Sequence, residues 1–521
     1  LNENILTWNK TFKDIHSLNI LGGFTIQRNN VESVTGASSN FVNDVMKYNN
    51  LGAGSIYDKP ESSATQWSLM SYLARINYSL YDRYLFSVNG RVDGSSRFGG
   101  NNKYGFFPSG SVAWRISEEG FMEPVKAVIN NLKLRTSYGF TGNTEIGVYE
   151  SLATLGSNSW TIGNQLVSGF YPNRIPNPDL KWEKTGQFDI GFDLGLFNNR
   201  LRLTADYYYK KTTDLLYNVA IPSASGYDSM LKNIGSVQNK GYELSIESDN
   251  LSGAFSWTTA FNISFNRNKV LELGGETYKD VGTYDDHLKT SDIRRLIVGQ
   301  PIGVFYGYRF DGIFQNEAEC AQQTSSPSPI GVGLRRYKDL NGDGKIDATN
   351  DREILGDANP KFFGGMTNTF AYKGFELNVF LQYSYGNKIF NYNAMELESP
   401  TGGQNVYQDL VNRWTPTNPS NEYQKATTNR NNIVSDRFIE DGSFLKLKTV
   451  SLSYSFPKLN WKHIGGLRLY VTGQNLLTWT KYRGYDPEVS YRGASTLEAG
   501  EDFGGYPQAR TFMFGIKLDI K

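Results

Sequence analysis

The chain has 521 residues, with 53 Lys and Arg against 52 Asp and Glu, 3 His, 1 Cys, 33 Tyr, 31 Phe and 53 Gly. A net charge of +1 without a basic block argues against nucleic-acid binding, because that binding depends on clustered Lys and Arg. The single Cys320 excludes an intrachain disulfide, and with only three histidines (His16, His287 and His463) a zinc site of His and Cys ligands is unfavourable.

The predicted elements are strands. Abundant Tyr, Phe and Gly favour strands and turns over helices. No stretch approaches the roughly 18 to 20 continuous apolar residues that a transmembrane helix needs. The first residues, Leu1 to Asn4, lack the charged-then-apolar leader of a secreted precursor. We therefore expect either that a leader has been removed or that the chain begins partway through a longer one.

Alternation of apolar and polar residues with period two is the strongest pattern in the sequence. It places one set of residues on each face of a strand. Phe255, Trp257 and Phe261 share one face, for example, while Ser256 and Asn262 share the other. The pattern predicts about fifteen strands, near residues 4–13, 17–28, 67–80, 83–94, 106–117, 131–140, 183–195, 200–213, 236–248, 254–267, 361–372, 374–386, 444–456, 467–478 and 508–520.

The lengths of these strands favour a membrane. A soluble sandwich also alternates, but globular strands average about five or six residues, whereas many of these run to about 10 to 13, enough to cross a bilayer at a tilt. Aromatic residues stand at their ends, as at Tyr207 to Tyr209, Trp257 and Trp479, where an interfacial girdle would lie. Edge aromatics in a large sandwich are the alternative interpretation.

Short and long connections alternate along the chain. Outer-membrane barrels have short periplasmic turns and long external loops, so we predict an all-β fold, a large antiparallel transmembrane β-barrel. An odd number of strands that ends at the periplasmic side must start outside, which indicates the C-terminal part of a larger, even-numbered barrel. The short connections are 14–16, 81–83, 118–131, 198–199, 250–253 and 372–374, and the long ones are 30–67, 95–105, 141–181, 214–235, 268–360, 387–442 and 479–508.

Several segments resemble one family in order and spacing. Residues 91–98 (RVDGSSRF) resemble a motif of the SusC/RagA-like TonB-dependent outer-membrane receptors, and Phe107 to Arg115 resembles the segment that follows it there. The resemblance covers nearly the whole chain. It continues at 134–143 (LRTSYGFTGN), 337–347 (YKDLNGDGKID), 438–457 (FIEDGSFLKLKTVSLSYSFP) and 473–488 (GQNLLTWTKYRGYDPE).

The resemblance implies an importer of large nutrients such as glycans or peptides. Its barrel would have about 22 strands around an N-terminal plug, and this chain would supply about the last fifteen of them. The implied partners are the TonB–ExbB–ExbD complex, a SusD-like surface lipoprotein, and membrane lipid with lipopolysaccharide. The sequence contains no recognisable plug or TonB-box region. We therefore expect energy coupling to belong to the complete receptor.

Residues 335–355 form a calcium-loop-like insertion within a predicted extracellular loop. Oxygen ligands stand at positions 1, 3, 5 and 9 of such a loop, a backbone carbonyl at 7 and a glycine at the sharp turn at 6. Position 12 is Asn350, and the carboxylate expected there comes one residue later. Asn-Gly and Asp-Gly turns whose side chains cap their own backbone are the alternative. The predicted ligands of a structural Ca²⁺ ion are Asp339, Asn341, Asp343, Lys345, Asp347 and Asp351.

No cluster of residues predicts catalysis, and we do not expect an enzyme. The polar residues of the 91–98 motif suggest loop anchoring at the outer end of a strand rather than an active site. Aromatic residues of the lumen and loops can stack on sugar rings or peptide side chains, or simply pack their loops. The candidate substrate contacts are Trp160, Tyr171, Trp414, Tyr485 and Tyr491.

Two other functions compete with active import. One is a barrel of the same family that serves as a scaffold or docking subunit of an outer-membrane complex. The other is an open diffusion porin. A plug with a TonB box would favour import, and single-channel conductance would identify a porin.

Overall fold

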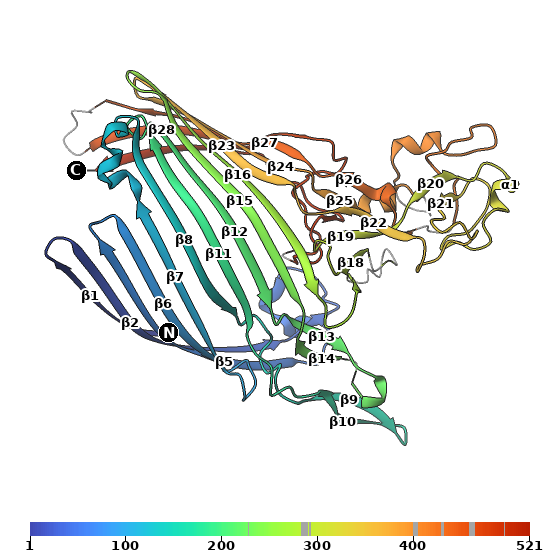
Figure 1. Ribbon diagram of the computed structural model, residues 1–521. Coiled ribbons are helices and arrows are strands. Elements are labelled where there is room, and N and C mark those ends of the chain that lie inside the picture. The colour runs from blue at the N-terminus through green and yellow to red at the C-terminus, as the bar shows by residue number, and fades with distance from the viewer. Residues whose placement is uncertain are drawn as a thin grey trace. The chain divides into compact units, whose positions relative to one another are not determined.

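Fifteen long strands form one sheet in this computed structural model, which describes residues 1–227, 229–282, 290, 293–399, 405–428, 432–457, 464–493 and 495–520. The strands follow one another in chain order across the sheet, interrupted only by short strands within the loops (Figure 1). Their bounds are β1 Asn2–Phe12, β2 His16–Thr35, β5 Glu61–Leu80, β6 Tyr84–Ser95, β7 Tyr104–Arg115, β8 Ile129–Asn143, β11 Glu183–Leu196, β12 Leu201–Thr213, β15 Ser236–Leu251, β16 Phe255–Glu272, β23 Phe362–Tyr372, β24 Phe375–Tyr385, β27 Phe444–Ser455, β28 Ile464–Thr480 and β30 Thr511–Ile520.

The predicted number of strands and their order are confirmed. Neighbouring strands run antiparallel in the pairings from β1 to β7 and from β16 to β30. Strands β2 and β5 extend farther than expected, because they pair continuously out to Thr35 and Glu61. The predicted 30–67 loop is therefore shorter than the sequence suggests.

The short connections are tight turns. Tyr372 pairs with Phe375 across a two-residue turn in which Lys373 and Gly374 have φ of 45° and 89°. Two central residues with positive φ match the right-handed twist of the flanking strands, and glycine adopts this conformation without a Cβ clash. The composition of this turn thus fixes the register of β23 against β24.

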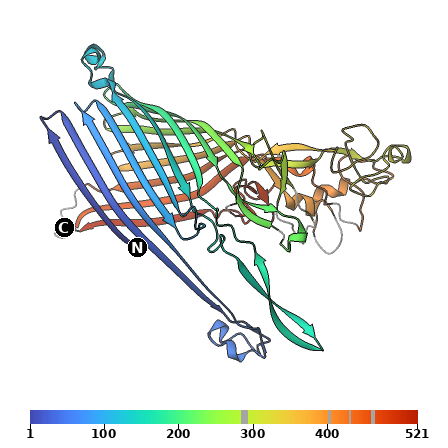
Figure 2. The ribbon, with the colours of Figure 1, turned by 60° about the horizontal axis from the view of Figure 1, so that its bottom comes forward.

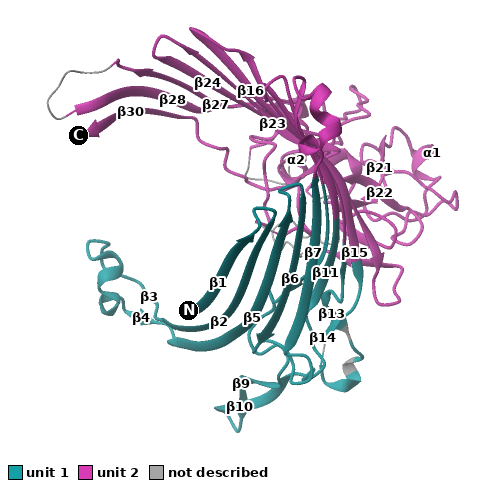
Figure 3. Cartoon of the chain, turned by 60° about the vertical axis from the view of Figure 1, so that its left-hand side comes forward, with its two compact units in different colours: residues 1–114, 135–188, 211–236 teal, residues 115–134, 189–210, 237–521 magenta. Residues whose placement is uncertain are grey.

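The chain divides into two compact units (Figure 3). Unit 1 comprises residues 1–114, 135–188 and 211–236. Its buried cluster is made of Phe98, Phe107, Ile146, Leu180 and Trp182. Its loop elements are β3 Ser38–Ser39, β4 Ile56–Tyr57, β9 Thr154–Ile162, β10 Gln165–Arg174, β13 Leu216–Ala220 and β14 Ser229–Asn233, with the 3₁₀ helices η1 Lys47–Asn49, η2 Leu51–Ala53 and η5 Ser223–Ser225.

Unit 2 comprises residues 115–134, 189–210 and 237–521. Its long loops fold around a core of their own, in which Phe305, Phe390 and Phe438 are fully buried. Figure 1 shows these loops gathered at one end of β16, β23, β24 and β27. Their elements are β17 Tyr278–Val281, β18 Arg294–Ile297, β19 Val304–Tyr308, β20 Phe310–Ile313, β21 Arg335–Tyr337, β22 Arg352–Asp357, β25 Lys388–Asn391, β26 Ile439–Asp441 and β29 Glu501–Asp502, helices α1 Glu317–Cys320 and α2 Tyr392–Leu397, and the 3₁₀ helices η6 Gln408–Asn412 and η7 Asp436–Phe438; η3 Ile116–Glu118 and η4 Gly120–Val125 form the moderate connection before β8.

Candidate functional site

Strands β24 and β27 have one apolar and one polar face. On β24, Phe375, Leu377 and Val379 pair with the apolar residues Tyr454, Leu452 and Val450 of β27. The alternate residues of β24, such as Asn378 and Gln382, pair with Ser451 and Lys446. The large apolar side chains stay exposed, as at Phe375, Leu452 and Phe514. Exposed aromatic and aliphatic rows on sheet strands are what a lipid-facing surface requires.

The 91–98 motif anchors loops in unit 1, as the sequence suggests. Arg97 Nη1 donates to the carbonyl oxygens of Thr144 at 3.1 Å and Ile146 at 2.9 Å, and its guanidinium lies 4.7 Å from the Trp67 ring centroid. Phe98 packs on Trp182 with ring centroids 4.9 Å apart. The motif therefore ties the end of β6 to the segment that follows β8.

Trp160 and Tyr171 share one face of the β9–β10 hairpin. The Trp160 ring lies over Gly169, and the Tyr171 ring lies over Gly156, which pairs directly with it. Both rings remain about two-fifths exposed. In Figures 1 and 2 the hairpin extends away from the other strands of its unit. Both the packing role and the substrate-contact role thus remain compatible with these two residues.

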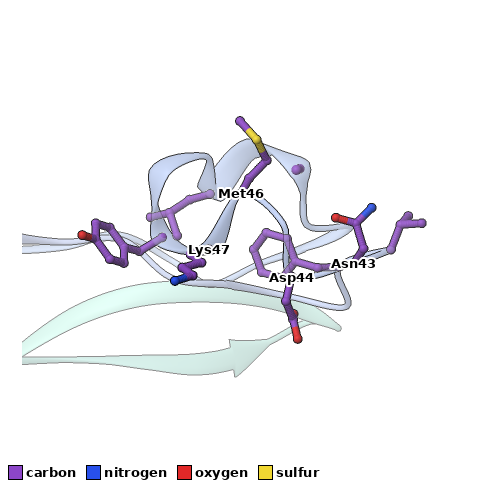
Figure 4. A pocket seen from close by; sticks show the side chains of 9 residues that line it. Asn43, Asp44, Met46 and Lys47 are labelled. Carbon is purple, nitrogen blue, oxygen red and sulfur yellow. The ribbon is translucent and has the colours of Figure 1, made fainter.

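The 36–60 loop of unit 1 presents apolar side chains to solvent. Val42, Val45 and Tyr48 are each more than four-fifths exposed. Residues 41–53 surround a hollow of about 400 Å³ (Figure 4), where the Asp44 and Met46 side chains leave the loop in opposite directions. Contiguous exposed apolar residues of this kind are typical of a surface that meets another molecule.

In unit 2, a buried charge cluster fixes the 481–508 segment to the polar face of β27. Lys446 Nζ lies 2.6 Å from both Asp486 Oδ1 and Glu488 Oε2, and Lys448 Nζ lies 3.1 Å from Glu488 Oε2. Lys446 and Lys448 are two positions apart on β27, so both side chains lie on the same face and can reach one carboxylate. Only 3% of the Lys446 side chain is exposed.

The charges of this cluster are set by competing effects. Burial acts to raise the pKa of Asp486, but the hydrogen bond from Lys446 and the backbone N–H of Glu488 outweigh it, so the pKa is lowered. For Glu488, burial is likewise outweighed by hydrogen bonds from both lysines, and its pKa is also lowered. Both groups are therefore carboxylates near neutral pH.

A second buried pair links the same segment to the loop core. Arg294 Nε donates to Glu501 Oε1 at 3.0 Å, and Arg294 Nη1 donates to the carbonyl oxygen of Gly303 at 2.7 Å. Burial raises the pKa of Glu501, against the effect of Arg294. Tyr482 donates to Asp502 Oδ2 at 2.5 Å. The 481–508 segment is thus bound to its surroundings at several points.

The three remaining candidate aromatics occupy different environments. Trp414 Nε1 donates to Gln315 Oε1 at 3.1 Å, and its ring lies against Gly333, so it packs the loop. Tyr491 packs edge-on against Phe503, with ring centroids 5.4 Å apart. Tyr485 is 81% exposed and is the most accessible of the five candidates. Whether any of them contacts substrate stays a prediction.

The carboxylates of the 339–351 loop accept hydrogen bonds from the loop's own backbone. Asp339 accepts from the N–H groups of Gly342 and Gly344, at 2.6 and 2.7 Å. The fully buried Asp351 accepts from the N–H groups of Leu340 and Asp347, both at 2.8 Å.

The other predicted ligands do the same. Asn341 accepts from the N–H of Asp343, Asp343 from that of Lys345, and Asp347 from those of Thr349 and Asn350. Within the described residues, no group of three or more His, Cys, Asp or Glu side chains is arranged to hold a metal ion. These hydrogen bonds are compatible with the backbone-capping alternative, and the calcium ion stays a prediction.

The other sequence expectations concern histidines and helices. His16 Nδ1 is hydrogen-bonded to the Tyr78 hydroxyl at 2.7 Å, while His287 and His463 lie outside the described residues. In the part of the chain that the structure describes, no helix is long and apolar enough to cross a membrane.

Neither the Lys446 cluster nor Tyr506, which is 92% exposed, is predicted by the sequence pattern. The sequence offers only a weak signal for this cluster: two lysines two positions apart on β27, and two carboxylates, Asp486 and Glu488, with the same spacing. Their partners lie about forty positions away, as Lys446 and Asp486 do, so spacing within one segment does not reveal them.

Comparison with known proteins identifies similar chains. The model of the family described as TonB dependent receptor-like, beta-barrel matches residues 4–313. The chain is 40% identical over 99% of its length to TonB-dependent receptor P3 of Formosa agariphila, of which it covers 52%. It is 32% identical over 88% of its length to TonB-dependent receptor SusC of Bacteroides thetaiotaomicron, covering 44% of that protein.

A solved structure of the RagAB peptide transporter is also similar. It superposes with a TM-score of 0.83 at 27% identity, over 99% of this chain and 55% of that one. The chain spans about half the length of the relatives that it matches.

Proposed function

The chain belongs to the TonB-dependent receptor-like β-barrel family, whose members are outer-membrane proteins, and from this premise we propose that it forms the larger part of the barrel of an active importer. The cargo we propose is a large nutrient, an oligosaccharide or a peptide. The observation that carries the proposal is the two-faced sheet, with exposed apolar rows on one face and Lys446, Gln382 and other polar side chains on the other.

The polar face supports transport rather than simple anchoring in lipid. A barrel whose strands turn polar side chains inward encloses a wet interior through which a polar solute can pass. The charge cluster around Lys446 holds a long loop segment against this face. The held segment therefore lies on the face that we assign to the wet interior.

The partners in this proposal are TonB with ExbB and ExbD, and a SusD-like surface lipoprotein. Support for the lipoprotein comes from the similarity to SusC and to a chain of the RagAB peptide transporter. The exposed apolar side chains of the 36–60 loop offer it a contact surface. The outward apolar rows would contact membrane lipid.

An uptake assay tests the proposal. Cells carrying the complete receptor are given fluorescent oligosaccharides and peptides, with and without functional TonB. If the receptor is an importer, one of these fluorescent compounds accumulates in cells with functional TonB and not in cells without it. The complete receptor in a planar bilayer should conduct almost no ions, whereas steady large currents would indicate a porin. Binding of the lipoprotein without any accumulation would instead indicate a scaffold.

A further inference from the structure

A hollow lined by both polar and aromatic side chains lies on the polar face of unit 1, where β6, β7, β8 and β11 follow one another in the sheet (Figure 1). It has two adjoining parts, of about 450 and 300 Å³. Asn89, Ser109 and Thr141 line both of them. Volumes of this size are within the range of small-ligand sites.

At the wall of the hollow, Gly139 allows β8 to lie close against β7, because glycine has no Cβ atom. A Cβ atom added at Gly139 would lie 2.4 Å from the Cβ atom of Ser109. At one end the hollow is closed by Phe107 and Trp182, whose ring centroids are 5.3 Å apart and which are both 8% exposed. The space is therefore bounded by packed aromatic rings and does not depend on a mobile loop.

At the rim of the hollow, the Arg91 guanidinium is held in place by hydrogen bonds and paired with a carboxylate. Its Nε donates to both carboxylate oxygens of Asp93, at 2.6 and 2.8 Å, and its Nη2 donates to Ser71 Oγ at 3.0 Å. Nη1 makes no hydrogen bond to any described residue, and the side chain is 46% exposed. The orientation of the guanidinium is thus set, its charge is neutralised, and one edge remains open.

The other polar groups of the hollow have hydrogen-bonding capacity to spare. Asn89 makes one long bond, from Nδ2 to Ser87 Oγ at 3.4 Å, which leaves its Oδ1 open. Across the described residues, the side chains of Ser109, Thr141 and Gln187 make no hydrogen bond, although all three line the hollow. Amides and hydroxyls offer both donors and acceptors without net charge.

We infer that this hollow binds a neutral sugar unit of the imported cargo, an inference that rests on the proposed function. Sugar hydroxyls both donate and accept, which matches the open groups of Asn89, Gln187 and Ser109. An anionic ligand is disfavoured because Asp93 already neutralises Arg91. Peptides are commonly bound by extending a sheet edge, but β6 and β7 are paired along their length and offer no edge here.

A thiol-labelling experiment on the complete receptor tests the site. The variant Ser109→Cys is made together with Cys320→Ser, and any cysteine in the rest of the receptor is also replaced by serine, so that the maleimide reagent meets a single thiol. A pool of neutral oligosaccharides of mixed linkage should slow labelling at least about threefold, while pools of oligouronates and of peptides should not. Protection by peptides or oligouronates alone, or by no pool, overturns the inference.

Uptake measurements separate this inference from the proposed function. Asn89→Ala and Gln187→Ala should each raise the KM for uptake of a protecting oligosaccharide by about threefold to tenfold, the effect of one lost hydrogen bond. Gln27→Ala is the matched control, since Gln27 lies on the polar face of β2 and lines neither part of the hollow. An unchanged KM in both variants overturns the sugar site and leaves import standing, whereas no TonB-dependent uptake by the unaltered receptor means that the import function fails.

Discussion

Lys446 Nζ lies 2.6 Å from Asp486 Oδ1, and this buried contact joins a sheet strand to a segment that follows the next strand. Replacing Lys446 by Met leaves Asp486 and Glu488 without their principal partner. Removing one member of a buried ion pair costs about 3 to 5 kcal/mol. This cost exceeds the free energy that holds a locally bound segment in place. We expect the 481–508 segment to detach and become sensitive to protease. The barrel itself should stay folded, which is seen as the mobility of the folded form when unheated samples are run on gels.

Lys448→Met is the matched control for that experiment. Lys448 contacts the same carboxylate, but its side chain is one-quarter exposed, so water can replace it. It should increase cleavage far less than Lys446→Met. Equal cleavage in the two variants would contradict a specific role of the buried lysine.

The same cluster predicts a response to acid. Because the folded-state pKa values of Asp486 and Glu488 are lowered, the stability that these carboxylates contribute is complete above their ordinary values and is lost as the pH falls through the lowered ones. The 481–508 segment should therefore stay protected at pH 5 to 7 and open only below about pH 4. Hydrogen exchange of this segment, measured against β16 as internal reference, checks the prediction. Opening that begins above pH 5 would contradict it.

Arg97 should stabilise the loop that follows β8. Arg97→Ala removes the two hydrogen bonds to the carbonyls of Thr144 and Ile146, each worth about 1 to 3 kcal/mol. Protease cleavage between 144 and 181 should increase, with no change in the amount of folded barrel. Arg97→Lys should not restore protection, because a compact ammonium group cannot stack on the Trp67 ring as the planar guanidinium does. Full protection in Arg97→Lys would show that charge alone suffices.

The strands could be predicted because the two faces of a membrane strand lie in different environments, one apolar and one polar. The side chains along the strand therefore alternate between apolar and polar. β16 is expected at 254–267 and found from Phe255 to Glu272. The extension of β2 beyond residue 28 was missed because Asn29 to Ser33 are mostly polar on both faces, which leaves no period to detect.

The folded loops of unit 2 could not be predicted in the same way. Their core joins Phe305, Phe390 and Phe438, which are separated by tens of residues. These residues belong to two short strands and a 3₁₀ helix, which are too short to show a hydrophobic period. The hollow on the polar face of unit 1 could not be predicted for the same reason. Asn89, Ser109 and Gln187 each fit the alternation of their own strand, but only the pairing of the strands assembles them.

The 339–351 loop gives a direct test of the calcium proposal. If Ca²⁺ binds, the ion slows proteolysis within 335–355 in the unaltered receptor, a chelator reverses this, and Asp343→Ala abolishes the difference while barrel assembly remains intact. Asp351→Ala should loosen the loop with or without Ca²⁺, because Asp351 accepts the N–H groups of Leu340 and Asp347 in either case. Identical cleavage in Ca²⁺ and chelator would leave the carboxylates with only their backbone-capping role.

The assignment of the two faces to lipid and to the interior is tested on β16. Phe261 lies on the apolar face, where its ring stacks near Tyr383 of β24 with centroids 6.3 Å apart, and Ala260 lies on the opposite, polar face. An arginine near the bilayer midplane costs about 2 to 4 kcal/mol when it faces lipid, but it remains hydrated when it faces a wet interior. Phe261→Arg should therefore lower the free energy of unfolding from lipid vesicles by about that amount, beyond the loss found for Phe261→Ala, while Ala260→Arg changes it little. A larger cost for Ala260→Arg would mean that the faces are reversed, because lipid and water would then lie on the opposite sides of the strand.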